Sequence, residues 1–231
     1  SQLLNEDDPL ATSWIGDQVT TYKKLQEGER FIGLGEKNGP LDRRGNAYTN
    51  WNTDAFGYGV DDDPLYLTTP FFMGLHKGLS YGIFLDNTYQ TTFSFGASSR
   101  RFSWFSAQGG EMDYYFFSGD VAEMIQDYSW LTGYMPLPPK WSLGYQQCRF
   151  SYYPEIEVRQ IARTFREKEI PCDVIYLDIH YMDDYRVFTF HPERFPNPQK
   201  LIDDLKEDGF RTAIIVDPGV KIDEEYSTYN E

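Results

Sequence analysis

The hydrophobic pattern of residues 1–119 predicts short β-strands. Runs of aromatic and β-branched residues are separated by Gly, Asn and Asp, and no helical period is present. The clearest runs lie at 19–22, 31–34, 79–85, 91–95 and 112–117. Crowded short strands predict a β-sandwich, and because these runs are too few for two covered sheets, we expect a partial one.

The first amphipathic helix is predicted at 120–131. Its apolar side chains recur three and four positions apart, and they are Val121, Met124, Ile125 and Tyr128. Asp120 can cap the first turn, and Gly133 stands where a helix commonly ends.

A stiff Pro-Leu-Pro-Pro segment follows at 136–139. Such a segment suits a connector between domains. The predicted organisation is therefore a sandwich domain at 1–119, a helix with its connector at 120–139, and a second domain at 140–231.

The second domain alternates strands with helices. The predicted strands lie at 141–148, 173–179 and 213–216, one helix begins at Pro154, and the other contains Leu201, Ile202 and Leu205 and ends at Gly209. The middle strand is apolar along most of its length, as in a parallel sheet covered on both faces. Such repeats predict a parallel sheet, either a barrel or a doubly wound sheet. Three strands cannot close a barrel of eight, so we expect either an open sheet or a chain that stops early.

Charge narrows the choice of partners. The chain has 36 acidic and 21 basic residues and a net charge of -15. This field repels nucleic-acid phosphates and anionic membrane surfaces, so we expect neither partner. No run reaches the ~20 apolar residues of a membrane span, and no glycine-rich nucleotide motif follows a strand. A neutral substrate such as a sugar, or a cationic one, fits this balance.

The two cysteines carry little functional signal. Cys148 and Cys172 lie at opposite ends of adjacent predicted parallel strands, too far apart for a disulfide. Neither has zinc-site spacing or an evident His partner. Free thiols are consistent with a reducing compartment, which favours the cytoplasm and leaves the periplasm open.

The densest cluster of reactive side chains lies at 178–186. Asp178 ends a buried strand, where a carboxylate either binds a sugar hydroxyl, acts as an acid or base, or caps its own loop. Asp217 ends the next strand. Metal ligation by Asp178, His180, Asp183 and Asp184 is disfavoured, because alternate strand residues point to opposite faces.

The loop at 50–59 mixes aromatic, amide and acidic side chains. Such a loop suits a sugar-facing surface, since rings stack on the apolar face of a sugar while Asp and Asn bind hydroxyls. A structural loop of the sandwich explains the same composition equally well. The acidic turn at 61–63 is expected to be a solvated loop rather than a calcium site.

Six runs of sequence resemble glycoside hydrolase family 31, in order, between about Gly28 and Val220. They are GERFIGLGEKNGPLDRRG, YTNWNTDAFGYG, DPLYLTTPFF, LPPKWSLGYQQCRFSYYPE, PCDVIYLDIHYMDDYRVFTFHPERFPNP and AIIVDPGVK. The resemblance implies a mixed α+β and α/β fold, a partial N-terminal β-sandwich followed by the first three βα units of a (β/α)8 barrel. It also implies an exo-acting, retaining α-glucosidase that acts on α-glucoside oligosaccharides and needs no cofactor and no metal.

The resemblance also assigns site residues. Asp54 resembles the loop acid that reaches the sugar, and Asp178 resembles the acid that binds hydroxyls of the terminal sugar. Ile179 and Ile215 resemble apolar residues of the same subsite. Asp217 and His180 are expected to contact the substrate-binding residues rather than the sugar itself. Many family members have Asp at the position of His180.

The resemblance places the nucleophile and the acid/base beyond Glu231, so we expect no catalytic residue within this chain, and none of Asp183, Asp184 and Asp223 fills these roles. We expect a fragment that supplies part of the sugar pocket. Its uncovered strand edges favour a homo-oligomer. An α-xylosidase, a carbohydrate-binding module and a metal-dependent barrel hydrolase are the alternatives.

Overall fold

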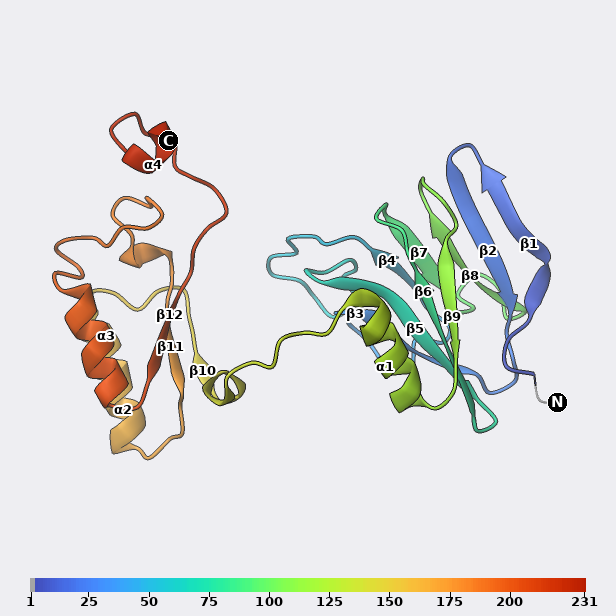
Figure 1. Cartoon of the computed structure of the whole chain (residues 1–231), viewed down its shortest axis with the longest axis horizontal. Helices are drawn as coiled ribbons and strands as arrows, with labels where there is room; N and C mark the ends of the chain where they lie inside the picture. Colours follow the sequence, from blue (N-terminus) through green and yellow to red (C-terminus); the bar gives the residue numbers. More distant parts are fainter. Residues whose placement is uncertain (1–2) are drawn as a thin grey trace. The chain divides into compact units, whose positions relative to one another are not determined.

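The computed structural model describes residues 3–231 (Figure 1). By its internal contacts the chain forms two compact units, Ser1–Tyr134 and Met135–Glu231. Each unit has its own hydrophobic core.

Unit 1 contains two antiparallel sheets. The five-stranded sheet has the order β1 (Asp7–Ile15), β2 (Gln18–Lys24), β8 (Phe102–Ala107), β7 (Thr91–Ser94) and β4 (Ala47–Asn50). The four-stranded sheet has the order β3 (Arg30–Gly35), β5 (Thr68–His76), β6 (Leu79–Leu85) and β9 (Tyr114–Ser118).

Aromatic rings fill the space between the two sheets. Phe72 of β5 lies with its ring centroid 5.9 Å from that of Phe93 on β7 and 6.5 Å from that of Phe105 on β8. All three side chains are almost fully buried. Alternation places them there, because every second residue of a strand faces the same side. The sandwich predicted from the sequence is therefore present.

The sequence pattern found only some of these strands. It located β2, β3, β6, β7 and β9 and passed over β1, β4, β5 and β8. The expectation of too few strands for two covered sheets was therefore wrong. β5 contains Pro70 and Gly74, which normally weaken a strand prediction. Pro70 is accommodated where the β3–β5 register shifts between Gly33 and Gly35.

The predicted helix is confirmed as α1 (Val121–Thr132). Asp120 accepts a hydrogen bond from the backbone N–H of Glu123, and the Glu123 side chain accepts one from that of Asp120, which completes a capping box. Tyr128 stacks on Phe71 of β5 at 4.4 Å between ring centroids. The helix thus covers the outer face of the four-stranded sheet.

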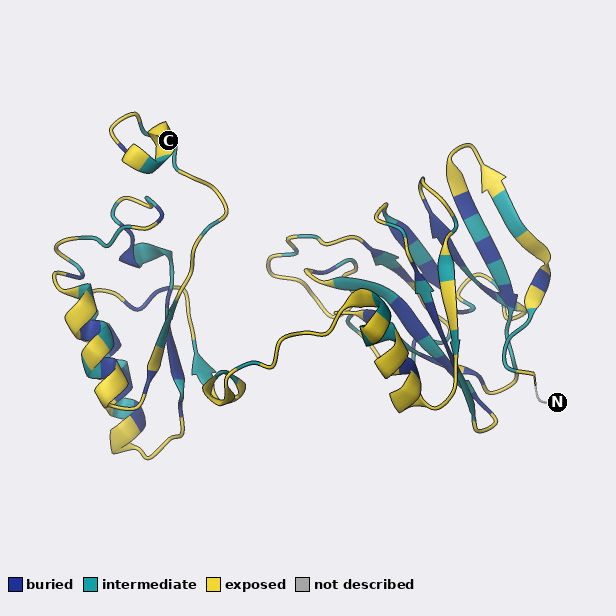
Figure 2. Ribbon diagram, in the orientation of Figure 1, coloured by how far each residue is buried: buried dark blue, intermediate teal, exposed yellow. Residues whose placement is uncertain are grey.

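Unit 2 contains a parallel sheet of β10 (Gln146–Gln147), β11 (Val174–Leu177) and β12 (Arg211–Ile214), in that order. The helices α2 (Glu155–Glu167) and α3 (Pro198–Glu207) pack on it, and their buried residues belong to the same hydrophobic cluster as those of β11; Figure 2 shows the buried positions along both helices. A short helix, α4 (Ser227–Asn230), lies near the end of the chain.

All three strand predictions in unit 2 need correction. The strand expected at 173–179 is confined to Val174–Leu177, because Asp178 caps the 3-10 turn Ile179–Tyr181. The strand expected at 141–148 shrinks to two residues, because Lys140–Leu143 forms a 3-10 turn in which the backbone N–H and the hydroxyl of Ser142 both donate to Pro139 O. The strand expected at 213–216 begins at Arg211 and ends at Ile214.

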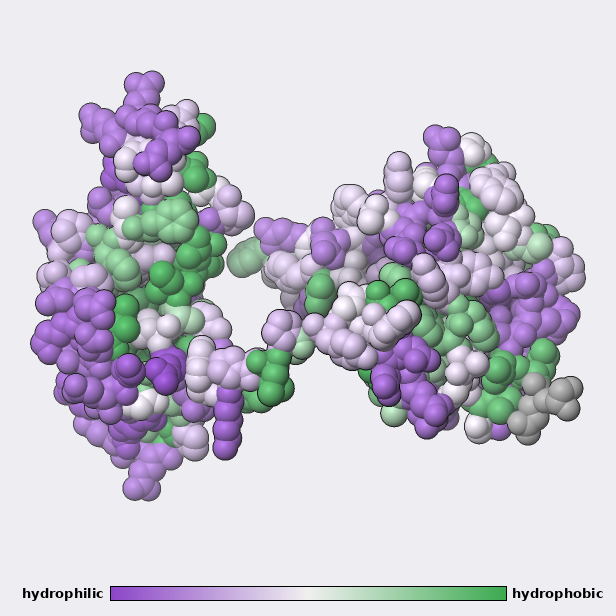
Figure 3. Space-filling view, viewed as in Figure 1, coloured by the Kyte–Doolittle hydropathy of each residue, from purple (hydrophilic) through white to green (hydrophobic). Residues whose placement is uncertain are grey.

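Apolar side chains remain exposed around β12. Ile214, Ile215 and Val216 are exposed by 38–48%. Figure 3 shows that hydrophobic surface gathers on one side of this unit.

Candidate functional site

Asp178 lies directly after β11, at the carboxyl end of the parallel sheet. It caps the 3-10 turn Ile179–Tyr181, and its Oδ1 accepts a hydrogen bond from the Ile179 backbone N–H at 2.8 Å. The side chain is half-buried. One oxygen is held by the backbone, so the other remains available to a ligand.

Cys148 lies beside Asp178, just after β10. Desolvation raises the pKa of the Cys148 thiol, and the nearby negative charge of Asp178 raises it further. A thiol with a raised pKa stays protonated at neutral pH and is a poor nucleophile. Both Cys148 and Cys172 are free, as the sequence predicted.

His180 is held by aromatic and hydroxyl partners. Ser151 Oγ lies 2.5 Å from His180 Nδ1 and also accepts a hydrogen bond from the His180 backbone N–H at 3.4 Å. The Tyr153 ring stacks on the imidazole at 4.7 Å, and the Phe150 ring meets it edge-on at 5.1 Å. The guanidinium group of Arg194 lies over the Tyr153 ring, 4.9 Å from the ring centroid.

The residues after β12 join the same end of the sheet. The backbone N–H of Ile215 donates to Leu177 O, and the Tyr181 hydroxyl donates to Ile215 O at 2.8 Å. Burial raises the pKa of Tyr181, and the charge of Asp217 adds to the shift. The structure therefore brings Asp178, Ile179, His180, Ile215 and Asp217 together where β11 and β12 end.

Three further acids of this region already have cationic partners. Asp184 pairs with Lys221, and this contact lowers the pKa of Asp184. Asp223 Oδ2 lies 2.5 Å from the Arg186 guanidinium, which also contacts Asp183 at 3.4 Å. Within residues 3–231, no group of three or more His, Cys, Asp or Glu side chains is placed to hold a metal ion.

Asp54 lies in unit 1, on the exposed loop between β4 and β5. Desolvation raises the pKa of the neighbouring Tyr66 hydroxyl, and the Asp54 carboxylate adds to this shift. Asp54 and the residues at the end of the parallel sheet belong to different units.

A buried lysine anchors the base of the Asp54 loop. The Lys37 side chain is fully buried, and its Nζ lies 2.7 Å from Asp63 Oδ1 and 2.5 Å from Thr49 O. Asp63 Oδ2 also accepts a hydrogen bond from the Thr49 backbone N–H. Burial lowers the pKa of Lys37, and the pairing with Asp63 opposes that shift. The acidic turn at 61–63 is exposed, as expected for a solvated loop, and Asp63 in addition anchors its base.

Sequence reasoning missed the residues that hold His180 and the loop anchor Lys37. Phe150, Ser151 and Tyr153 follow β10 directly, so the dense aromatic run after a barrel-type strand was an available signal. No local pattern marks Lys37, since its partner Asp63 lies 26 residues away.

Family models match both units. Residues 2–94 match the glycosyl hydrolase 31 N-terminal galactose mutarotase-like domain, and residues 135–231 match the glycosyl hydrolases family 31 TIM-barrel domain. The chain belongs to glycoside hydrolase family 31. The resemblance recognised in the sequence is thus confirmed for both parts of this family 31 chain.

Several family 31 relatives are similar along most of the chain. Alpha-glucosidase 2 of Bacillus thermoamyloliquefaciens is 54% identical over 96% of this chain, and an alpha-glucosidase of Saccharolobus solfataricus is 35% identical over 93%. A family 31 dextranase of Flavobacterium johnsoniae, solved in complex with isomaltotriose, matches 93% of the chain with a TM-score of 0.86 and 43% identity.

The family 31 chain spans only part of these relatives. It covers 28% and 31% of the two alpha-glucosidases and 26% of the dextranase. In the part of the chain that the structure describes, no helix is long and apolar enough to cross a membrane.

Proposed function

We propose that this chain is part of an exo-acting α-glucosidase that releases terminal α-linked glucose with retention. The observation that carries the proposal is Asp178, a half-buried acid without a cationic partner among the described residues, at the carboxyl end of a parallel strand. Catalytic and binding groups of barrel enzymes gather at that end. The names of the similar alpha-glucosidases support the same activity.

In this proposal, Asp178 accepts hydrogen bonds from hydroxyls of the terminal sugar. Ile179 and Ile215 offer apolar contact to the sugar ring, and Asp217 and His180 hold the surrounding turn. Asp54 reaches the sugar from its loop. No cofactor and no metal take part.

Bond cleavage requires two carboxyl groups about 5–5.5 Å apart, one that attacks the anomeric carbon and one that protonates the leaving oxygen. We place neither role within residues 1–231. The acids that follow Asp178 on the same loop, Asp183 and Asp184, contact Arg186 and Lys221. In this proposal these contacts hold the loop, and neither acid takes part in bond cleavage.

The deciding experiment measures release of nitrophenol from p-nitrophenyl α-D-glucopyranoside by the full-length protein. We expect hydrolysis by the wild type. The Asp178→Asn variant should lose about 10–10²-fold in kcat/KM, because a charged hydrogen bond to the sugar is removed from the transition state. Asp184→Asn is the matched control, and it should retain near-wild-type kcat/KM.

Near-wild-type hydrolysis by Asp178→Asn would remove Asp178 from the site. Cleavage of the p-nitrophenyl α-xyloside in place of the glucoside would favour an α-xylosidase. Binding of α-glucans without any hydrolysis would favour a carbohydrate-binding module.

One observation favours a second candidate, an enzyme that acts on isomaltose-type α-glucans. The similar Flavobacterium johnsoniae protein is a dextranase solved with isomaltotriose. Comparing kcat/KM for maltotriose and isomaltotriose separates the two candidates. A preference for isomaltotriose, with internal cleavage of dextran, would replace the exo-glucosidase proposal.

A further inference from the structure

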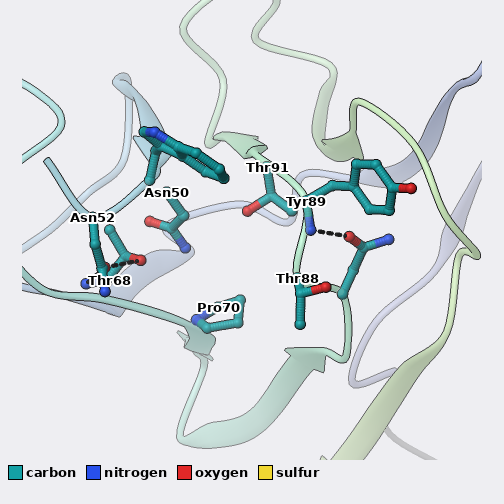
Figure 4. Close-up of a pocket in the computed structure, with 9 residues that line it drawn as sticks. Asn50, Asn52, Thr68, Pro70, Thr88, Tyr89 and Thr91 are labelled. Carbon is teal, nitrogen blue, oxygen red and sulfur yellow. Dashed lines mark hydrogen bonds between the residues drawn. The ribbon is translucent and has the colours of Figure 1, made fainter. Parts of the chain in front are cut away.

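A cavity of about 300 Å³ opens at one end of the sandwich in unit 1 (Figure 4). It lies between the sheets: Asn50 and Thr91 come from β4 and β7 of one sheet, and Thr68 and Pro70 come from β5 of the other. Trp51 completes this part of the lining. Its volume lies at the lower end of the range of small-ligand sites.

The register of the sheet sets two polar side chains against each other in this cavity. Asn50 and Thr91 are direct partners in the β4–β7 pairing. Direct partners in an antiparallel pair share one face, with Cβ atoms about 5 Å apart. Figure 4 shows the Thr91 hydroxyl turned towards the Asn50 amide.

The Asn50 amide has unsatisfied hydrogen-bonding capacity. The residue is 5% exposed, and within residues 3–231 neither its Oδ1 nor its Nδ2 has a hydrogen-bond partner. A buried polar group without a partner destabilises the fold unless a bound molecule pairs with it. Since Asn50 lines the cavity, an occupant with hydroxyl groups can both donate to Oδ1 and accept from Nδ2.

The walls of the cavity are fixed by their own hydrogen bonds. Asn52 Oδ1 accepts from both the backbone N–H and the hydroxyl of Thr68, each at 2.9 Å. Asn87 Nδ2 donates to Gly109 O and to Glu111 O, and Asn87 Oδ1 accepts from the Tyr89 backbone N–H. These bonds hold both rims in place, so a ligand finds the cavity already formed.

The lining contains amides, hydroxyls, a proline and two aromatic side chains, and none of its residues is charged. Trp51 and Tyr89 are exposed by 50% and 56%. A neutral lining does not select ions, even in a chain of net charge -15. Neutral polyols suit it, because their hydroxyls pair with amides while their C–H faces lie on aromatic rings.

We propose that this cavity, which is lined by unit 1 residues alone, binds one sugar unit of an α-linked glucose oligosaccharide. The choice of α-linked glucose rests on the proposed function, whereas the neutral-saccharide chemistry rests on the cavity itself. Asp54 does not line the cavity, although it follows Trp51 and Asn52 on the same loop.

The test measures maltotriose and isomaltotriose binding to the full-length Asp178→Asn protein by isothermal titration calorimetry. Asp178→Asn weakens the proposed active site, and the part of the remaining binding that Thr91→Val removes and Thr92→Val does not remove reports on the cavity. Adding Thr91→Val should weaken that binding about fivefold, since one neutral hydrogen bond is lost without a change of shape. Adding Trp51→Ala should weaken it at least as much.

Thr92→Val is the matched control. It makes the same change one residue along β7, where the side chain faces the opposite side of the sheet. We expect it to leave the affinity unchanged, and we expect all variants to keep the wild-type melting temperature within a few degrees. Cellotriose, a β-linked trisaccharide, should bind more weakly than maltotriose.

Absence of sugar binding to the Asp178→Asn protein would overturn the proposal, as would equal affinities for the Thr91→Val and Thr92→Val proteins. A crystal soaked with maltotriose that shows only water beside Asn50 would overturn it too. The binding measurement needs no turnover. A protein that fails to hydrolyse α-glucosides therefore refutes the proposed function, whereas sugar binding by the cavity is tested separately by calorimetry.

Discussion

At the scale of single residues, the acids of unit 2 differ in what surrounds them. Asp178 has a backbone donor and a neutral thiol beside it, whereas Asp184 and Asp223 contact Lys221 and Arg186. Ion-paired acids stabilise the fold, and an acid without a cationic partner is available to a ligand. Sequence position alone does not make this distinction, because all of these acids lie in loops.

The acid sensitivity of unit 2 should depend on Asp204. Hydrogen bonds from Lys200 and then Arg159 lower the pKa of Asp204 below its ordinary value of 3.8. A carboxyl group whose pKa is lowered by folding contributes stability that is present above the unfolded pKa and is lost as the pH falls through the folded pKa. The Asp204→Asn variant should therefore lose less stability than the wild type when the pH falls below about 4.

Urea unfolding of the full-length protein between pH 3 and 7 checks this prediction. Asp203→Asn is the control, since Asp203 accepts its hydrogen bond from the neutral Gln199 amide. Parallel stability curves for the wild type and Asp204→Asn would show that the contacts with Lys200 and Arg159 do not affect folding.

At the scale of elements, the capping box of α1 is the clearest local determinant. Replacing Asp120 by Ala removes the acceptor for the Glu123 backbone N–H. The expected loss is about 1 kcal/mol of unfolding free energy, the usual cost of removing an N-cap. Chemical denaturation measures it, and Asp127→Ala, an exposed change within the same helix, should have a clearly smaller effect.

The elements that the sequence predicted correctly are those with strong local signals. The helix α2 was located because Val158, Ala162 and Phe165 recur with helical spacing, and these side chains are indeed buried. β1 was missed because it is an edge strand with a single buried residue, Asp8, so it has no apolar alternation to detect.

Residues of the candidate site were likewise predicted only where the local sequence carries a signal. Asp178 was found because it follows an apolar strand, whereas Asn50 stood out only once the structure showed which amide lacks a partner. Pairings over long sequence separations are not encoded in any local pattern. They depend on which strands become neighbours, as Asn50 and Thr91 do across the β4–β7 pair.

At the scale of the whole molecule, exposed apolar residues predict self-association. β10 and β12 are the edges of the parallel sheet, and Ile214, Ile215 and Val216 are exposed beside β12. Unpaired strand edges with apolar side chains associate with other chains. We expect the 231-residue chain, expressed alone, to elute as oligomers or aggregates in size-exclusion chromatography with light scattering.

The Val216→Lys variant should shift this population towards the monomer, because a charge beside the edge opposes pairing. Ile222→Lys is the control: Ile222 is 80% exposed but lies outside the strands. A monodisperse monomer of the unmodified chain would contradict the prediction.

The strand pairing of the sandwich also sets an order of events during synthesis. Every strand of its two sheets pairs with a partner inside residues 7–118, and α1, which covers one sheet, ends at Thr132. Chains leave the ribosome from the N-terminus at about 5–20 residues per second, and domains generally fold as units. The sandwich, with the cavity at Asn50, can therefore be complete while the ribosome is still translating the parallel strands, so a nascent chain stalled after residue 170 should already resist proteases up to α1.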